Sequence, residues 1–248
     1  MYKKHDSFFA LKHRKNKKIS STINRIIKVS KDISTIEKLS SEGQKIFKQV
    51  TADVLNDTET HLRNKFNLKS NVIAEIDTIP DLDLPRYLVH RYRYEIFPQT
   101  KTIDNFPPYL QIEPTSICNY RCVFCFETDK TFTDKKNGHM GQMTLDLFKK
   151  VIDQAEGNIE FISLASRGEP LACSNIVKML EYTTGKFLNL KLNTNASLLD
   201  EKKCHAILSG GVKTVVFSAD AATEPLYSKL RVNGSLSKVI KNIENFKR

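Results

Sequence analysis

The sequence has 248 residues, of which 40% are hydrophobic and 27% charged, proportions that are ordinary for a globular protein. No apolar run approaches the roughly 18 residues that cross a membrane, and the apolar patch Phe8–Leu11 is too short for a secretory signal. We therefore expect a cytoplasmic protein. Three of the five cysteines lie within eight residues, a clustering that favours metal binding over a secreted disulfide framework.

The net charge of +11 is concentrated at the N-terminus. Residues 1–31 contain ten Lys or Arg against the single acid Asp6, which gives this arm a net charge of +9. Such an arm could contact RNA, anionic lipid or an acidic partner. A solvated arm is the simpler interpretation, and we do not expect nucleic acid as a partner, because charges nearly balance in the rest of the chain.

The first 100 residues have a helical periodicity. Apolar residues recur every three or four positions through 19–40 and again from Ile46 to Val54, which predicts amphipathic helices. The segments Ile79–Pro85 and Phe97–Pro108 are rich in proline and indicate linker or extended chain. We therefore predict a basic, mainly helical N-terminal region with linker over residues 1–100, and a second domain over 106–248.

Strands and helices alternate in the second domain. We predict strands at Tyr109–Glu113, Ile159–Ala165, Leu188–Leu192 and Lys213–Ser218, and helices after Thr144 and at Ile176–Thr184, Asp200–Leu208 and Leu236–Phe246. This alternation indicates a parallel sheet with ligand sites at the carboxyl ends of its strands. Four β/α units are too few to close a barrel, since eight units take about 250 residues. The predicted fold is therefore α/β, a partial (β/α) barrel with parallel strands, preceded by a mainly helical region.

A cysteine-bearing loop follows the first predicted strand of this domain. Cys118, Cys122 and Cys125 have the spacing C-x3-C-x2-C. Three thiolates on one loop can bind three irons of a cubane cluster and leave the fourth iron open. The alternative is a zinc knuckle that uses His139, although His139 stands alone and zinc ligands usually come in pairs.

Further motifs stand at the ends of the predicted strands and after the last of them. They are Ser166-Arg167-Gly168-Glu169-Pro170, Asn193-Thr194-Asn195, Ser218-Ala219-Asp220 and Arg231-Val232-Asn233-Gly234. Together with the cysteine loop, these motifs make residues 109–248 resemble the radical SAM superfamily, especially the branch whose longer members carry a SPASM or twitch extension. The resemblance implies that residues 106–248 are a radical SAM core domain.

The resemblance also implies two cofactors. Cys118, Cys122 and Cys125 would hold a [4Fe-4S] cluster, and S-adenosylmethionine (SAM) would bind its open iron. Reductive cleavage of SAM would give a 5′-deoxyadenosyl radical that abstracts a substrate hydrogen. The positions that match the family's SAM contacts are Phe124 near the adenine, Gly168 and Glu169 at the methionyl amino group, Asn193 near the ribose and Ser218 at the polar groups.

The family implies partners as well, namely a peptide or small-molecule substrate and a reductant such as flavodoxin or ferredoxin. Two features depart from the family pattern. Arg167 replaces the first glycine of Gly-Gly-Glu-Pro, and we hypothesise that it recognises an anionic group on SAM or on the substrate. The fifth and sixth strands are also absent, so we expect a truncated or split protein, or a fragment, that lacks a C-terminal half.

Two other functions remain open from the sequence. One is a catalytically inactive protein that binds the cluster or SAM, and the other is a basic zinc-binding nucleic-acid protein. Cys173 and Cys204 are isolated from the cysteine loop, and we expect both to be small buried hydrophobic residues.

Overall fold

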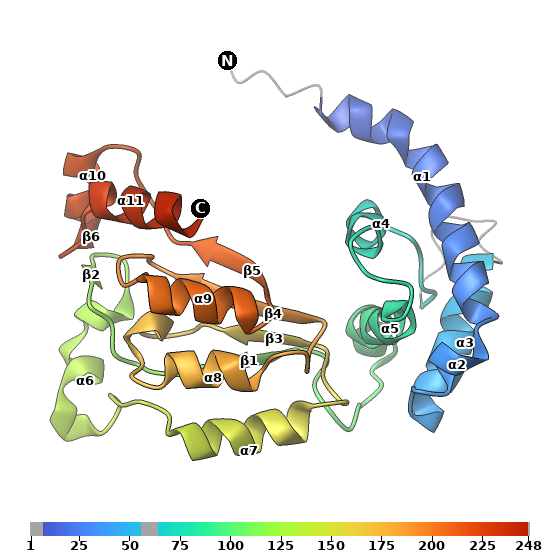
Figure 1. Cartoon of the computed structure of the whole chain (residues 1–248), viewed down its shortest axis with the longest axis horizontal. Helices are drawn as coiled ribbons and strands as arrows, with labels where there is room; N and C mark the ends of the chain where they lie inside the picture. The colour runs from blue at the N-terminus through green and yellow to red at the C-terminus, as the bar shows by residue number, and fades with distance from the viewer. Residues whose placement is uncertain (1–6, 56–63, 248) are drawn as a thin grey trace. The chain divides into compact units, whose positions relative to one another are not determined.

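A computed structural model describes residues 7–55 and 64–247 of the chain (Figure 1). The chain divides into two compact units, Met1–Pro108 and Tyr109–Arg248. None of the helices in the described ranges is long and apolar enough to cross a membrane. Of the predicted basic arm, residues 1–6 lie outside the described part of the chain.

The described part of the first unit is helical. Its helices are α1 (Ser7–Ser30), α2 (Ile33–Ile36), α3 (Ser41–Leu55), α4 (Ser70–Ile76) and α5 (Leu84–Thr100). The periodic segment 19–40 is thus divided between α1 and α2, and the side chain of Asp32 caps α2 by accepting from the Ser34 N–H. Helices α1, α3 and α5 pack against one another. They bury Ile26, Val50 and Tyr87 completely.

Helix α5 covers most of the segment between the two proline-rich stretches. Pro85 lies in the first turn, where no intrahelical N–H partner is required. Pro98 lies in the last turn, and the helix ends at Thr100. The next residue, Lys101, caps it in a left-handed conformation and donates its N–H to the carbonyls of Phe97 and Pro98. The prediction of linker is therefore wrong where it falls within Leu84–Thr100, whereas residues 79–83 and 101–108 lie outside helices as predicted. The boundary between the units falls at Pro108.

The second unit is an α/β structure built on four parallel strands. Its strands are β1 (Leu110–Ile112), β3 (Phe161–Leu164), β4 (Asn189–Thr194) and β5 (Val212–Phe217), in the order β1-β3-β4-β5. A separate pair is formed by β2 (Arg121–Cys122) and β6 (Arg231–Val232), which run antiparallel. All four predicted strands are present, which confirms the predicted partial (β/α) barrel with parallel strands.

Helices connect the strands of this sheet and cover one of its faces (Figure 1). They are α7 (Leu145–Ala155), α8 (Ile176–Tyr182) and α9 (Glu201–Ser209), with α10 (Glu224–Leu230) and α11 (Leu236–Phe246) after β5. The loop after β2 carries the short helices η1 (Phe126–Thr128), α6 (Lys130–Thr133) and η2 (Lys135–Asn137), and η3 (Pro170–Ala172) follows β3.

The strand register separates an apolar face from a polar one. Ile162 pairs with Leu190, and Leu164 with Leu192, and all four side chains are buried. Because neighbouring residues of a strand point to opposite faces, Lys191 and the positions two residues away from it lie on the other face. That face carries Ser163, Lys191, Asn193, Thr214 and Val216 in register. The carboxyl ends of all four strands meet at one edge.

Candidate functional site

The cysteine loop is anchored at its middle by β-pairing. Cys122 and Arg121 form β2, and Cys122 pairs with Arg231 of β6. The N–H of the next residue, Val123, donates to the carbonyl of Leu230 at 2.9 Å. Cys122 is 8% exposed, whereas Cys118 and Cys125 are partly exposed. The loop therefore presents its first and third thiols while its second is held against the segment that follows α10.

Protein donors surround the first two sulfurs. Cys118 Sγ accepts from the Tyr120 N–H at 3.4 Å and lies 4.0 Å from Nδ2 of Asn195. Cys122 Sγ accepts from Nη1 of Arg231 at 3.7 Å. Burial raises the pKa of Cys118 to about 11 and also raises that of Cys122, which the Arg231 guanidinium opposes. A metal that binds these sulfurs must therefore displace their protons.

The donor set suits a corner of a cubane cluster. All three cysteines are free thiols on one loop, and thiolates are the ligands of iron–sulfur clusters. In the described ranges no group of three or more His, Cys, Asp or Glu side chains converges on a position for a single metal ion. The ring of His139, the zinc ligand considered from the sequence, packs against Phe132 with ring centroids 5.8 Å apart.

The Gly-Glu-Pro loop after β3 lies directly on the segment that leads to the first cysteine. Gly168 has a φ of +69°, and a Cβ atom there would lie 2.3 Å from the carbonyl oxygen of Thr115. The next N–H, that of Glu169, donates to the carbonyl of Ile117 at 2.9 Å. Only glycine permits this approach, so the two loops have a fixed relative position.

Glu169 links the ends of two strands. It is 2% exposed, and its Oε1 accepts from the Leu171 N–H at 3.1 Å and from the Thr194 hydroxyl at 2.6 Å, while Oε2 accepts from the Asn195 N–H at 2.7 Å. Burial raises the pKa of this carboxyl, and the three donors oppose that shift. A carboxylate has about four acceptor sites, so one remains for a ligand.

The end of β4 is tied to the cysteine loop by an amide network. Asn195 Nδ2 donates to Oδ1 of Asn119 at 3.0 Å, and Asn119 Nδ2 donates to the Ser197 hydroxyl at 2.8 Å. Asn193 lies two residues earlier on the polar face, and its buried Oδ1 has no hydrogen-bond partner in the part of the chain that is described. Ser218 follows β5 and donates its N–H to the carbonyl of Thr194 at 2.9 Å.

Arg167, which we hypothesise to recognise an anionic group on SAM or on the substrate, also has an anionic partner within the chain. Its Nε and backbone N–H donate to Oε2 of Glu113 at 3.1 and 3.0 Å, and its Nη2 donates to Oε1 at 3.1 Å. This forked pair joins the ends of β1 and β3. A guanidinium fits a carboxylate in this way because both groups are planar.

The structure also shows a role for Arg231, the first residue of the Arg231-Val232-Asn233-Gly234 motif. Arg231 is 8% exposed, pairs with Asp220, contacts Cys122 and lies 5.7 Å from the ring centroid of Phe124. Phe124 itself is 59% exposed. The Arg-x-x-Gly motif was the signal in the sequence that pointed to Arg231. Its contact with Cys122 could not be predicted, because it depends on the pairing of β2 with β6, and strands of two residues leave no pattern in a sequence.

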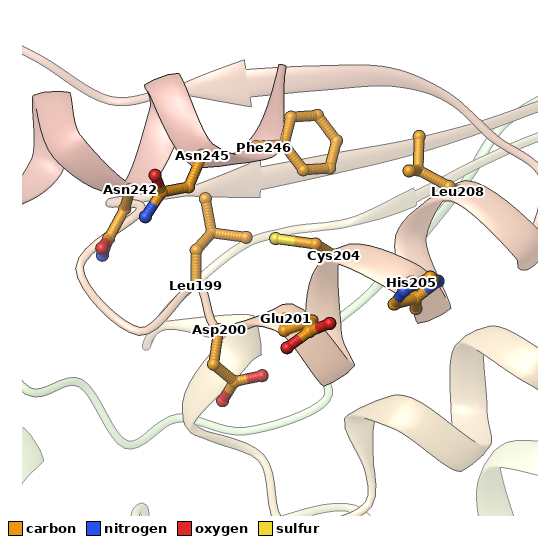
Figure 2. Close-up of a pocket in the computed structure, with 9 residues that line it drawn as sticks. All are labelled: Leu199, Asp200, Glu201, Cys204, His205, Leu208, Asn242, Asn245 and Phe246. Carbon is orange, nitrogen blue, oxygen red and sulfur yellow. The ribbon is translucent and has the colours of Figure 1, made fainter. Parts of the chain in front are cut away.

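A separate cavity lies between α9 and α11 (Figure 2). It has a volume of about 490 Å³ and is lined by Leu199, Asp200, Glu201, Cys204, His205, Leu208, Asn242, Asn245 and Phe246. Figure 2 shows the Cys204 sulfur pointing toward Leu199, with the Phe246 ring on the α11 side. Cys204 is therefore partly exposed rather than buried, whereas Cys173 is buried as expected. None of the predicted cofactor ligands lines this cavity.

A known protein family matches the second unit of the chain. The family model "Radical SAM superfamily" matches residues 112–248, which is more than half of the chain. The chain belongs to the radical SAM superfamily. Radical SAM proteins bind a [4Fe-4S] cluster and SAM, which favours a cubane over a zinc knuckle at the cysteine loop.

Two curated relatives show how much of a radical SAM protein the chain covers. A tungsten-containing aldehyde ferredoxin oxidoreductase cofactor-modifying protein of Pyrococcus furiosus is 32% identical over 114 residues, 45% of this chain and 30% of that protein. A GTP 3′,8-cyclase of Clostridium botulinum is 31% identical over 143 residues, 55% of this chain and 42% of that protein. The chain thus spans less than half the length of these relatives.

Solved structures give weaker matches. SuiB of Streptococcus suis bound to S-adenosylmethionine has a TM-score of 0.47 at 21% identity, covering 66% of this chain and 37% of SuiB. The anSMEcpe structure with bound AdoMet has a TM-score of 0.44 at 23% identity, covering 56% and 41%. Membership of the SPASM or twitch branch stays a prediction from the sequence motifs.

Proposed function

We propose that residues 109–248 hold a [4Fe-4S] cluster on Cys118, Cys122 and Cys125 and bind SAM beside it. Bound there, the reduced cluster would supply the electron for reductive cleavage of SAM to methionine and a 5′-deoxyadenosyl radical, and this radical would abstract a hydrogen atom from the substrate. The observation that carries this proposal is the close seating of the loop with three free thiols on the Gly-Glu-Pro loop and the end of β4.

The cysteine loop would bind the iron with help from its neighbours. The guanidinium of Arg231 beside Cys122 favours the deprotonated sulfur, and the Tyr120 N–H does the same for Cys118. Asp220 holds the Arg231 guanidinium in place from the other side. These contacts offset part of the cost that burial imposes on a thiolate.

The strand ends would bind SAM through the groups that have hydrogen-bonding capacity left. Glu169 has a remaining acceptor site suited to the methionyl ammonium, and the unpartnered Oδ1 of Asn193 suits a ribose hydroxyl. Gly168 would place its main chain beside the methionyl amino group, Ser218 would contact the polar groups of SAM, and the exposed ring of Phe124 would lie near the adenine. Each of these assignments follows the family's motif positions.

The substrate class is proposed as a peptide or a small molecule. One SuiB structure has a bound precursor peptide, and the curated relatives include GTP 3′,8-cyclases, so both classes occur among the similar proteins. We propose a flavodoxin or ferredoxin as reductant, a cytoplasmic location, and further strands that complete the barrel, because four parallel strands leave β1 and β5 as edges of the described sheet.

The test is anaerobic reconstitution of the full chain with iron and sulfide, followed by reduction with dithionite and measurement of 5′-deoxyadenosine from SAM. We expect 5′-deoxyadenosine from the natural chain and from Cys204→Ala, a control in the separate cavity, and none from Cys122→Ala. A four-iron cluster without 5′-deoxyadenosine would indicate a cluster-binding protein without turnover. Stoichiometric zinc without a cluster would overturn the proposal.

A further inference from the structure

A buried carboxylate lies two residues after the third cysteine. Glu127, in η1, is 2% exposed, and neither of its carboxylate oxygens has a hydrogen-bond partner among the described residues. Burying a carboxylate without partners is expensive unless a cation compensates it. The cation at hand is Arg121, whose Nη1 lies 3.6 Å from Oε2 of Glu127.

Arg121 lies between the first two cysteines and holds the main chain there. Its Nη1 donates to the carbonyl of Cys118 at 2.8 Å and to the carbonyl of Tyr120 at 2.7 Å. The same nitrogen faces Glu127. One guanidinium therefore joins the backbone around the first cysteine to a carboxylate that lies two residues after the third.

Burial raises the pKa of the Glu127 carboxyl, and the positive charge of Arg121, followed by that of Arg167, opposes this rise. The ion pair with Arg121 is therefore the contact that compensates the buried carboxylate.

We propose that Arg121 and Glu127 form a positioning pair for the iron–sulfur cluster. The pair fixes the spacing of Cys118 and Cys125, and the carboxylate offsets the Arg121 charge next to the cluster. Both effects have a direction. Loss of the pair should loosen the iron, and loss of the Glu127 charge alone should leave Arg121 uncompensated, which favours the reduced cluster and raises its reduction potential.

The inference rests on the proposed cluster, and the experiment separates the two. The full chain and its variants are reconstituted anaerobically, and three quantities are measured: iron and sulfide per chain, the rate of iron loss to EDTA, and the midpoint potential by redox titration monitored by electron paramagnetic resonance. The variants are Glu127→Gln, Arg121→Gln, the double variant with both changes, and Glu127→Asp. Glu181→Gln, an exposed acid on α8, is the matched control.

We expect Glu127→Gln to lose iron roughly tenfold faster than the natural chain, the lower end of the effect of groups that orient metal ligands, and to have a more positive potential. The double variant should lose iron as quickly but return toward the natural potential, because both charges are gone. Glu127→Asp should recover the potential in part. Glu181→Gln should match the natural chain in all three measurements.

A role in folding alone would give a different result. It would lower the melting temperature of the cluster-free chain without moving the potential of the reconstituted one, and that outcome overturns the proposal. So does a Glu127→Gln chain that keeps both the natural rate of iron loss and the natural potential. If Glu127→Gln does not fold, Arg121→Gln provides the same test. Because it removes a positive charge, it should shift the reduction potential to a more negative value. A natural chain that takes up no iron overturns the proposed function, and this inference with it.

Discussion

Gly168 is the residue at which a single methyl group should have the largest effect on the site. Its positive φ strains any other residue, and a Cβ atom would lie 2.3 Å from the Thr115 carbonyl oxygen and 2.8 Å from the carbonyl carbon of Ser116. Backbone atoms on both loops cannot move away cheaply. We expect Gly168→Ala to lower the free energy of unfolding by about 2–4 kcal/mol, measured by urea denaturation of the cluster-free chain.

Gly157→Ala is the control for backbone strain without a steric clash. Gly157 has a similar φ of +77°, but a Cβ atom there would meet no atom within 4 Å. Its substitution should cost about 1 kcal/mol from the left-handed conformation alone. Equal losses for the two variants would show that contact between the two loops contributes nothing to stability.

Individual site residues differ in how far the sequence could predict them. The three cysteines and the Gly-Glu-Pro segment were recognisable because each forms a compact local motif. The partners of Arg167 and Arg231 were not, because each contact joins residues that only the fold brings together. Arg167 and Glu113, for instance, are 54 positions apart.

At the scale of an element, α5 carries a buried histidine that should make the first unit sensitive to acid. His90 is 5% exposed, stacks on Tyr94 and forms a hydrogen bond with the backbone carbonyl of Pro108. Burial, reinforced by the neighbouring Arg91 and Arg93, lowers its pKa from 6.5 to about 3. The neutral ring is thus favoured in the folded state, so this stability is present above pH 6.5 and is lost as the pH falls toward 3.

This shift corresponds to a loss of about 2–3 kcal/mol between pH 7 and pH 4.5. We expect His90→Phe to reduce the difference in unfolding free energy between those two pH values, measured by urea denaturation followed by circular dichroism. His205→Phe, on the exposed side of α9, should leave the difference unchanged. An identical acid dependence in the natural chain and His90→Phe would contradict the assignment.

Helix α5 also shows where periodicity and local residue signals fail. The prolines at 85 and 98 suggested linker, yet proline is compatible with the first turn, and Pro98 is tolerated just before the left-handed cap at Lys101. The four parallel strands of the second unit were predicted well because each is a short apolar segment of the sequence bounded by loop residues. The strands β2 and β6, which pair with each other, have only two residues each and therefore no periodicity to detect.

At the scale of the whole molecule, each unit buries its own apolar core. The first unit buries Phe47, Val50 and Leu88, and the second buries Ile162 and Leu192. Because stability comes mainly from such cores, we expect the units to unfold as separate cooperative steps. Scanning calorimetry of the cluster-free full chain should then resolve two transitions.

The residue and element substitutions identify which transition belongs to which unit. Gly168→Ala should lower one transition temperature, and lowering the pH from 7 to 4.5 should lower the other, with the second effect reduced in His90→Phe. The effects of Gly168→Ala and His90→Phe on the free energy of unfolding should add within about 0.5 kcal/mol, because His90 belongs to the core of the first unit and Gly168 to the second unit. A single transition that responds to both substitutions would show that the units unfold together, and the cores would then have to be treated as one cooperative structure.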